Sequence, residues 1–263
     1  MRLVVTAGFD GSVPALATSE LLRRSGHSVV AVIVVTPFNL DRVKTMLKQR
    51  GISGLKKVAS KLVPRERAND ELNLQKKFLI DKEIHFTSLK TWCKLNQVNY
   101  IVVNNLNSGE SIKFLNQSKP DAVLYAGGGI LRSSFIEAAN HKIVNNHSGP
   151  LPEVRGMNAV EWSILLGYEP SVTIHMIDRG IDTGEIISRV RLSFCKGDSI
   201  ETIRAKAVIC GIEEIVRLFY GLTDLNDLTK KQNEYSLDKR QCYILAPALR
   251  ELLLWKLKGC LSD

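Results

Sequence analysis

Short apolar runs recur along the first half of the chain, and turn residues or polar segments bound each of them. Runs rich in β-branched residues are typical of parallel strands that are buried on both faces. We therefore expect strands at 3–5, 29–35, 100–103, 122–125 and 142–144, and helices between them at about 12–25, 39–50, 87–95, 109–117 and 132–140. Strands that alternate with helices indicate βαβ units, and hence an α/β fold with a mainly parallel sheet.

The pattern changes after Asn145. A loop with Pro and Gly is followed by a predicted helix near 157–166, strands near 171–177 and 185–193, and a long helix from Asp198 to Gly221. Asp198 and Glu201 resemble a capping box, and Gly221 suits a helix end. Residues 52–80 are rich in Lys, Arg, Glu and Asn, which favours an inserted polar helix-and-loop segment.

Length and pattern together predict one main domain with a tail. The 263 residues suffice for a catalytic domain over 1–222, followed by a C-terminal helical extension over 223–263. Within that extension, the apolar residues from Tyr243 to Trp255 favour a helix that packs on the domain. Forty residues are too few for a convincing independent domain.

Charge and cysteine content narrow the classes of partner and compartment. A formal net charge of +9 favours anionic partners such as phosphorylated substrates, tRNA or an acidic membrane surface, although a solvated basic surface explains it equally well. The five cysteines form no Cys-x-x-Cys pair, so no zinc ribbon or other metal site and no redox dithiol is expected. The N-terminus lacks a signal-peptide pattern, and the apolar stretch 29–35 is too short to span a bilayer. We expect a cytoplasmic protein without membrane partners.

The residues with candidate chemistry follow the last buried strand of this pattern. Asn145 and His147 are two residues apart, so strand geometry points both side chains in one direction. Open α/β sheets bind ligands outside the carboxyl ends of their strands. An amide donor beside an imidazole suits acyl transfer, because it can stabilise negative charge on the carbonyl oxygen and carry a proton. Asp182, in a Gly-Ile-Asp-Thr-Gly turn, is the candidate carboxylate for accepting the proton of an attacking amine.

Two ordered motifs carry a family resemblance. The first is Asn145-Asn-His147-Ser-Gly-Pro-Leu-Pro-Glu-Val-Arg155-Gly156, and the second is Asp178-Arg-Gly180-Ile-Asp182-Thr-Gly184. Together they resemble the formyltetrahydrofolate-dependent formyltransferases, which act on methionyl-tRNA, glycinamide ribonucleotide or amino sugars. The resemblance is continuous from about 120 to 187. It implies a Rossmann-like formyltransferase fold with a twisted, mainly parallel sheet flanked by helices and a C-terminal extension.

The resemblance also implies roles for particular residues. Asn145, His147 and Asp182 are expected to be catalytic. The loop 125–131 and the turn around Asp182 are expected to wrap the pteridine ring of the co-substrate 10-formyltetrahydrofolate, largely through backbone groups. The cofactor-binding residues would be Gly128, Gly129, Leu131, Gly180 and Ile181.

Other polar positions leave alternatives open. Gly11 and Ser12 open the first predicted helix, where backbone amides can bind a substrate phosphate, but a turn capped by Ser12 is an equal alternative. Arg155 suits either an anionic substrate group or a structural salt bridge. Trp162 is expected to pack on a helix face, and lining the acceptor pocket is the less favoured alternative. His175 is expected in the core or behind the site. Surface positions are expected for His27, His85 and His141.

The identity of the acceptor is the least constrained inference. The loop 149–162 resembles the branch that acts on amino sugars and other small amines, and the tail does not show the β-barrel domain of the tRNA-acting members. The sequence thus favours transfer to the primary amine of a small phosphorylated or nucleotide-linked acceptor. Transfer to methionyl-tRNA or glycinamide ribonucleotide, or hydrolysis of formyltetrahydrofolate, are the alternatives. Nucleic acid is not the favoured partner, and the sequence does not indicate an oligomeric state.

Overall fold

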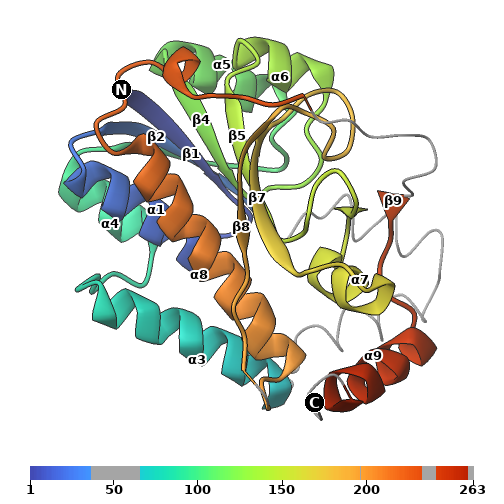
Figure 1. Ribbon diagram of the computed structural model, residues 1–263. Coiled ribbons are helices and arrows are strands. Elements are labelled where there is room, and N and C mark those ends of the chain that lie inside the picture. Colours follow the sequence, from blue (N-terminus) through green and yellow to red (C-terminus); the bar gives the residue numbers. More distant parts are fainter. Residues whose placement is uncertain (37–65, 196, 233–240, 260–263) are drawn as a thin grey trace, which may run out of the picture.

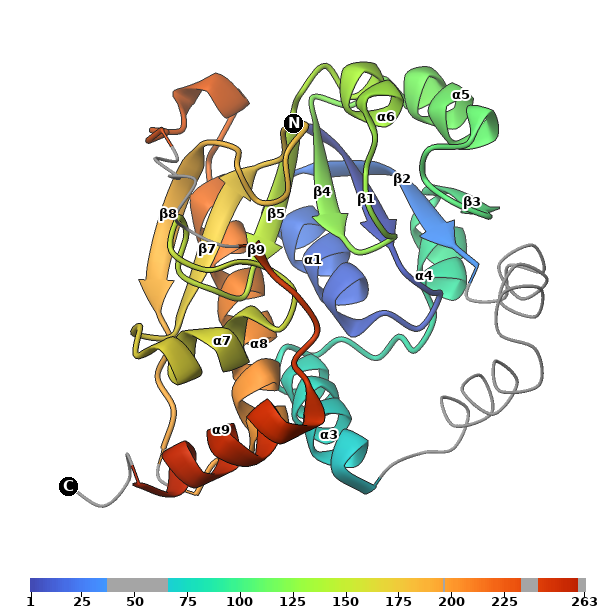
Figure 2. The same cartoon turned by 90° about the vertical axis from the view of Figure 1, so that its right-hand side faces the viewer.

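A seven-stranded sheet with helices on both faces forms the body of the protein (Figures 1 and 2). The structure is a computed structural model that describes residues 1–36, 66–195, 197–232 and 241–259. The strands of the main sheet are β1 (Arg2–Ala7), β2 (Ser28–Val35), β3 (Asn99–Val103), β4 (Ala122–Ala126), β5 (Ile143–His147), β7 (Ser171–Met176) and β8 (Ile186–Arg191). The predicted α/β class is confirmed.

The helices are named in chain order. They are α1 (Val13–Arg24), α3 (Glu66–Asp81), α4 (Leu89–Asn96), α5 (Gly109–Ser118), α6 (Ser133–Ala138), α7 (Ala159–Leu166), α8 (Ile200–Phe219), the single turn η1 (Leu225–Asp227) and α9 (Pro247–Gly259). A small second sheet pairs β6 (Arg155–Gly156) with β9 (Gln241–Cys242).

The strand order defines where a ligand can bind. It runs β3-β2-β1-β4-β5-β7-β8, with parallel pairing from β3 to β5 and antiparallel pairing from β5 through β7 to β8. The direction of winding reverses between β1 and β4, so the connections leave these two strands toward opposite faces. Open α/β sheets bind ligands outside the carboxyl ends of the strands at such a point.

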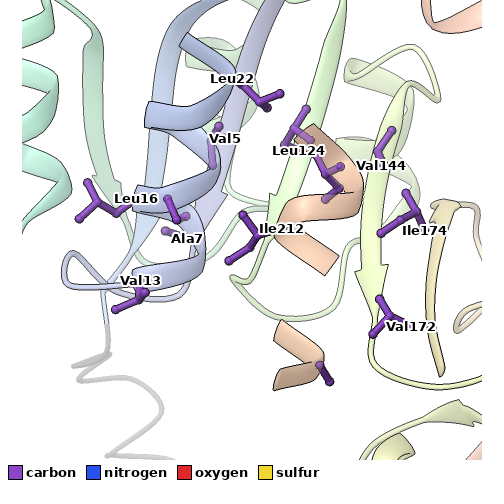
Figure 3. Close-up of a cluster of buried hydrophobic side chains, with 14 of the residues drawn as sticks. Val5, Ala7, Val13, Leu16, Leu22, Leu124, Val144, Val172, Ile174 and Ile212 are labelled. Carbon is purple, nitrogen blue, oxygen red and sulfur yellow. The ribbon is translucent and has the colours of Figure 1, made fainter. Parts of the chain in front are cut away.

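Alternating side chains of the parallel strands feed two apolar cores. On β1, Leu3 and Val5 join the core that α1, α4 and α8 cover, whereas Val4 joins the core that α5 and α6 cover. All three side chains are fully buried. Figure 3 shows part of the first core, where Leu16 of α1 and Ile212 of α8 lie beside residues of the sheet. Burial on both faces explains why these strands appear as continuous apolar runs in the sequence.

Several sequence expectations need correction or fall outside the described residues. The long helix is α8, and Ser199 caps it because its Oγ accepts the Thr202 N–H at 3.1 Å. Asp198 is therefore not the capping residue; it accepts the Cys195 N–H and pairs with Lys206. The predicted helix 39–50 and residues 52–65 lie outside the described residues, while the rest of the polar segment forms most of α3, which packs on α8.

His27 is buried, contrary to the expected surface position, with only 6% of its surface exposed. Its Nε2 lies 2.7 Å from the Phe219 carbonyl oxygen at the end of α8, and its Nδ1 lies 3.4 Å from the terminal amine of Met1. These long-range partners gave no local signal in the sequence. His85 and His141 are exposed, as expected.

The C-terminal extension contains the predicted helix. Leu253 and Leu257 of α9 are buried, and α9 packs against α7. Arg250 pairs with Glu201 at 2.6 Å, and Lys256 donates to the Leu165 carbonyl at 3.0 Å. Both apolar and polar contacts therefore hold the extension on the main domain. Among the helices that the structure describes, none has the length and apolar character needed to cross a bilayer.

Candidate active site

The two motif residues of β5 are held inside the sheet rather than beyond its edge. The prediction ended this strand at 144, but β5 continues to His147 because β7 pairs with it in antiparallel register. That register places His175 directly opposite Asn145. Side chains of directly opposed residues are close neighbours, and Asn145 Nδ2 lies 3.0 Å from His175 Nε2.

Asp182 reaches the same place from the loop between β7 and β8. Its Oδ2 lies 3.4 Å from His147 Nδ1, and its Oδ1 lies 3.7 Å from His175 Nε2. The Gly156 N–H also donates to Oδ2, at 2.8 Å. Asp182 has a φ of 53°, in the left-handed region that Asp and Asn adopt more readily than most residues. Two separated motif loops therefore converge on one carboxylate.

The two imidazoles have different hydrogen-bonding environments. His147 has an acceptor on each side, since its Nε2 lies 2.8 Å from the Val154 carbonyl oxygen and its Nδ1 faces Asp182. These two acceptors fix the orientation of the ring. Its side chain is 6% exposed.

His175 is held as a neutral ring. Burial, reinforced by the nearby His147, lowers the pKa of His175 from its ordinary value of 6.5. Its Nδ1 lies 2.7 Å from the Met176 carbonyl oxygen, which can only accept, so Nδ1 carries the proton. Nε2 is then free of a proton and accepts from the Asn145 amide. The sequence placed His175 in the core or behind the site, but its contact with Asn145 becomes evident only from the pairing of β5 with β7.

An apolar cavity opens beside this cluster. It has a volume of about 520 Å³, and Asn145, His175 and Asp182 contribute to its wall. Most of the other lining side chains are apolar or aromatic, among them Tyr125, Ile130, Leu131, Met157, Ile177, Ile181 and Tyr243. We call this space the apolar cavity.

A second, charged cavity lies beside His147. Its volume is about 330 Å³, and His147 contributes to its wall. The lining includes Glu71 of α3, Glu161 of α7 and Arg204 of α8, together with the amides of Asn146 and Asn158. Glu161 pairs with Arg204 and accepts from Asn158 Nδ2. Burial raises the pKa of Glu71 above 4.5.

The glycine-rich loop after β4 forms one edge of the apolar cavity. Gly128, with a φ of 129°, packs against Leu106 and does not line the cavity, whereas Gly129 does. A side chain at Gly129 would project into open space, so the glycine leaves the backbone accessible. Leu131, Gly180 and Ile181 also line the cavity.

Gly11, Ser12 and Arg155 were the positions proposed to bind anions, and Ser12 and Arg155 each form a hydrogen bond within the protein. Ser12 caps α1, its Oγ lying 3.4 Å from the Ala15 amide, and neither Gly11 nor Ser12 lines the apolar or the charged cavity. Arg155 Nη1 donates to the Ile181 carbonyl at 3.4 Å, which joins the two motif loops. Trp162 packs on a small cluster of Val154, Ala159 and Cys242.

Comparison with known proteins agrees with this geometry. The family model described as "Formyl transferase" matches residues 1–216. Methionyl-tRNA formyltransferase of Finegoldia magna is 27% identical over 139 residues, which cover 52% of this chain and 45% of that protein. The enzyme of the same name from Thermodesulfovibrio yellowstonii is 34% identical over 107 residues, covering 40% of this chain and 35% of that protein. The matched segments thus span less than half the length of these relatives.

Solved structures share the fold. A phosphoribosylglycinamide formyltransferase from Anaplasma phagocytophilum has a TM-score of 0.57 at 19% identity, covering 90% of this chain and 95% of that chain. The sugar 3N-formyl transferase WlaRD, solved with dTDP and 5-N-formyl-THF, has a TM-score of 0.54 at 15% identity, covering 92% and 69%. The sheet order, the two motif loops and the match over residues 1–216 lead to one conclusion: the chain belongs to the formyl transferase family.

Proposed function

We propose that the protein transfers the formyl group of 10-formyltetrahydrofolate to the primary amine of a small acceptor. The observation that carries this proposal is the position of Asn145, His147 and Asp182 between two cavities, one apolar and one charged. Two cavities that meet at one polar cluster suit a reaction between a flat, largely apolar donor and a polar acceptor.

The apolar cavity fits the folate. Its volume of about 520 Å³ lies in the ~300–1,000 Å³ range of small-molecule sites. The open space beside Gly129 allows a flat ring to approach the backbone, and Leu131, Gly180 and Ile181 would contact it. The bound folate would supply an activated formyl group.

The polar side chains then have distinct proposed roles. The Asn145 amide, held by His175, would donate to the formyl oxygen as negative charge develops there; one such donor contributes about 3–4 kcal/mol. As the bond between the formyl carbon and the folate nitrogen breaks, His147 would pass a proton to that nitrogen, so that tetrahydrofolate leaves neutral at this position. Asp182, which contacts His147 Nδ1, would accept the proton of the attacking amine through water.

The charged cavity supports the choice of acceptor. Carboxylates, a guanidinium and two amides provide hydrogen-bonding partners for a hydroxyl-bearing amine such as an amino sugar, and they would disfavour an apolar methionine side chain. The net charge of +9 favours a phosphorylated or nucleotide-linked acceptor. Arg155, Gly11 and Ser12 remain the proposed contacts for anionic groups.

A screen of acceptors tests the proposal. The full chain is mixed with 10-formyltetrahydrofolate and either a dTDP- or UDP-linked amino sugar, glycinamide ribonucleotide or initiator methionyl-tRNA, and tetrahydrofolate release is followed. We expect release to depend on a nucleotide-linked amino sugar. Rapid release without any amine would instead identify a formyltetrahydrofolate hydrolase.

A further inference from the structure

Residues 241–245 run along the apolar cavity, although they lie beyond residues 1–216 that match the family. Gln241 and Tyr243 contribute to the cavity wall. Gln241–Cys242 forms β9, which pairs in parallel with β6 of the first motif loop. Figure 2 shows the chain continuing from β9 down to α9. The extension is therefore in direct contact with the proposed folate site.

Hydrogen bonds to Met157, Asn158 and Trp162 hold this segment on either side of Tyr243. The Met157 N–H donates to the Cys242 carbonyl at 3.0 Å, and the Leu245 N–H donates to Asn158 Oδ1 at 3.1 Å. Between them, the indole N–H of Trp162 donates to the Tyr243 carbonyl at 2.8 Å. Hydrogen bonds therefore hold the backbone of Tyr243 and of the residues around it.

Gly156 connects this segment to Asp182. Its φ is +92°, and a Cβ at this position would overlap the Cys242 carbonyl, so only glycine allows β9 to approach so closely. The N–H of the same residue donates to Asp182 Oδ2 at 2.8 Å. The extension therefore braces the loop that positions the proposed catalytic carboxylate.

The side chain of Tyr243 is 68% exposed at the rim of the cavity. Ile130, 73% exposed, and Met157, 55% exposed, line the same cavity. Exposed apolar side chains that gather at a cavity mark a binding surface. Aromatic rings favour offset or edge contacts with other flat rings.

We infer that residues 241–245 are part of the folate site, with Tyr243 contacting the flat ring system and Trp162 holding Tyr243 in place. This inference rests on the proposed function, because it takes folate as the occupant of the apolar cavity. It assigns a ligand-binding role to the extension, which the sequence alone predicted only as a packing helix.

Titration of the full chain with 5-formyltetrahydrofolate by calorimetry tests the inference. We expect Tyr243→Ala to weaken binding about tenfold, and Tyr243→Phe, which keeps the ring, to change it less than about twofold. Tyr220→Ala is the matched control, because Tyr220 is 79% exposed at the end of α8 and lines neither cavity. Unchanged binding in Tyr243→Ala would overturn the inference, whereas no binding by the unmodified chain would overturn the proposed function itself.

A second variant tests whether Trp162 holds Tyr243 in place. Trp162→Phe removes the indole N–H while keeping an aromatic ring for packing, and we expect binding to weaken about threefold, as loss of one hydrogen bond should. In the Tyr243→Ala background, the same substitution should have almost no further effect, because the hydrogen bond acts through Tyr243. Equal weakening in both backgrounds would show that Trp162 does not act by holding Tyr243.

Discussion

Asp182 Oδ2 lies 3.4 Å from His147 Nδ1, although His147 ends β5 and Asp182 lies 35 positions later, in the loop between β7 and β8. The Gly156 N–H donates to the same oxygen at 2.8 Å, so two residues of the first motif hold the carboxylate of the second. This contact is the geometric basis for assigning the pair to proton transfer.

Removing the charge of Asp182 should impair catalysis without unfolding the site. Asn adopts the left-handed conformation of this position and keeps an oxygen for the Gly156 N–H. We expect Asp182→Asn to lower kcat about a hundredfold or more, and Asn145→Ala and His147→Ala to do the same. The exposed Asp227→Asn of η1 is the control. Full activity in any of the three site variants would remove that residue from the mechanism.

The buried His175 should make stability depend on pH. Because its pKa is lowered in the folded protein, the unfolded chain binds more protons as the pH falls below 6.5. The stabilisation is therefore complete above 6.5 and is lost as the pH falls toward the lowered pKa. We expect the difference in unfolding free energy between wild type and His175→Gln, measured by urea denaturation, to shrink over this range. A difference that is constant with pH would contradict a neutral, buried His175.

Glu71 should affect the acceptor and not the folate. It lines the charged cavity from α3 and does not line the apolar cavity. Glu71→Gln is expected to raise the KM of a hydroxyl-bearing amine about tenfold, as loss of a charged hydrogen-bond partner should, and to leave 5-formyltetrahydrofolate binding unchanged. Glu110→Gln on the exposed surface of α5 is the matched control. Weaker binding of 5-formyltetrahydrofolate by Glu71→Gln would contradict the assignment of this side chain to the acceptor site.

Glu20 should matter for stability rather than for activity. Burial alone would raise its pKa, but hydrogen bonds from Arg23, Trp92 and Arg24 outweigh burial and lower the pKa to about 2. We expect Glu20→Gln to reduce the free energy of unfolding by about 1–3 kcal/mol at neutral pH. The difference is present above 4.5 and is lost as the pH falls toward 2. Glu213→Gln, which removes an exposed ion pair with Lys82, should cost less than about 1 kcal/mol.

The parallel strands and the paired motif residues could be predicted from the sequence because their signals are local. Continuous apolar runs identified β1 to β4, and the spacing of Asn145 and His147 predicted that both side chains point in one direction, although the strand was expected to end at 144 and β5 continues to His147. The Gly-Ile-Asp-Thr-Gly turn indicated Asp182 as a candidate carboxylate and the family motif gave it a catalytic role, but its approach to His147 depends on a turn that no periodicity specifies.

The contribution of the extension could not be predicted in the same way. β9 is only two residues long, and it forms because Gly156 leaves room for the backbone of Cys242, 86 positions later. The burial of His27 likewise depends on the Phe219 carbonyl, far away in the chain. Such contacts between distant segments leave no pattern in either segment alone.

Transfer of an isotopic label tests the central claim most directly. The protein is incubated with 10-[¹³C]formyltetrahydrofolate and a nucleotide-linked amino sugar, and the products are followed by carbon NMR. We predict that the label appears as a formamide on the sugar in the same amount as tetrahydrofolate released, and that Asp182→Asn abolishes this signal. Label that appears only as free formate, at the same rate with and without the amine, would contradict formyl transfer at this site.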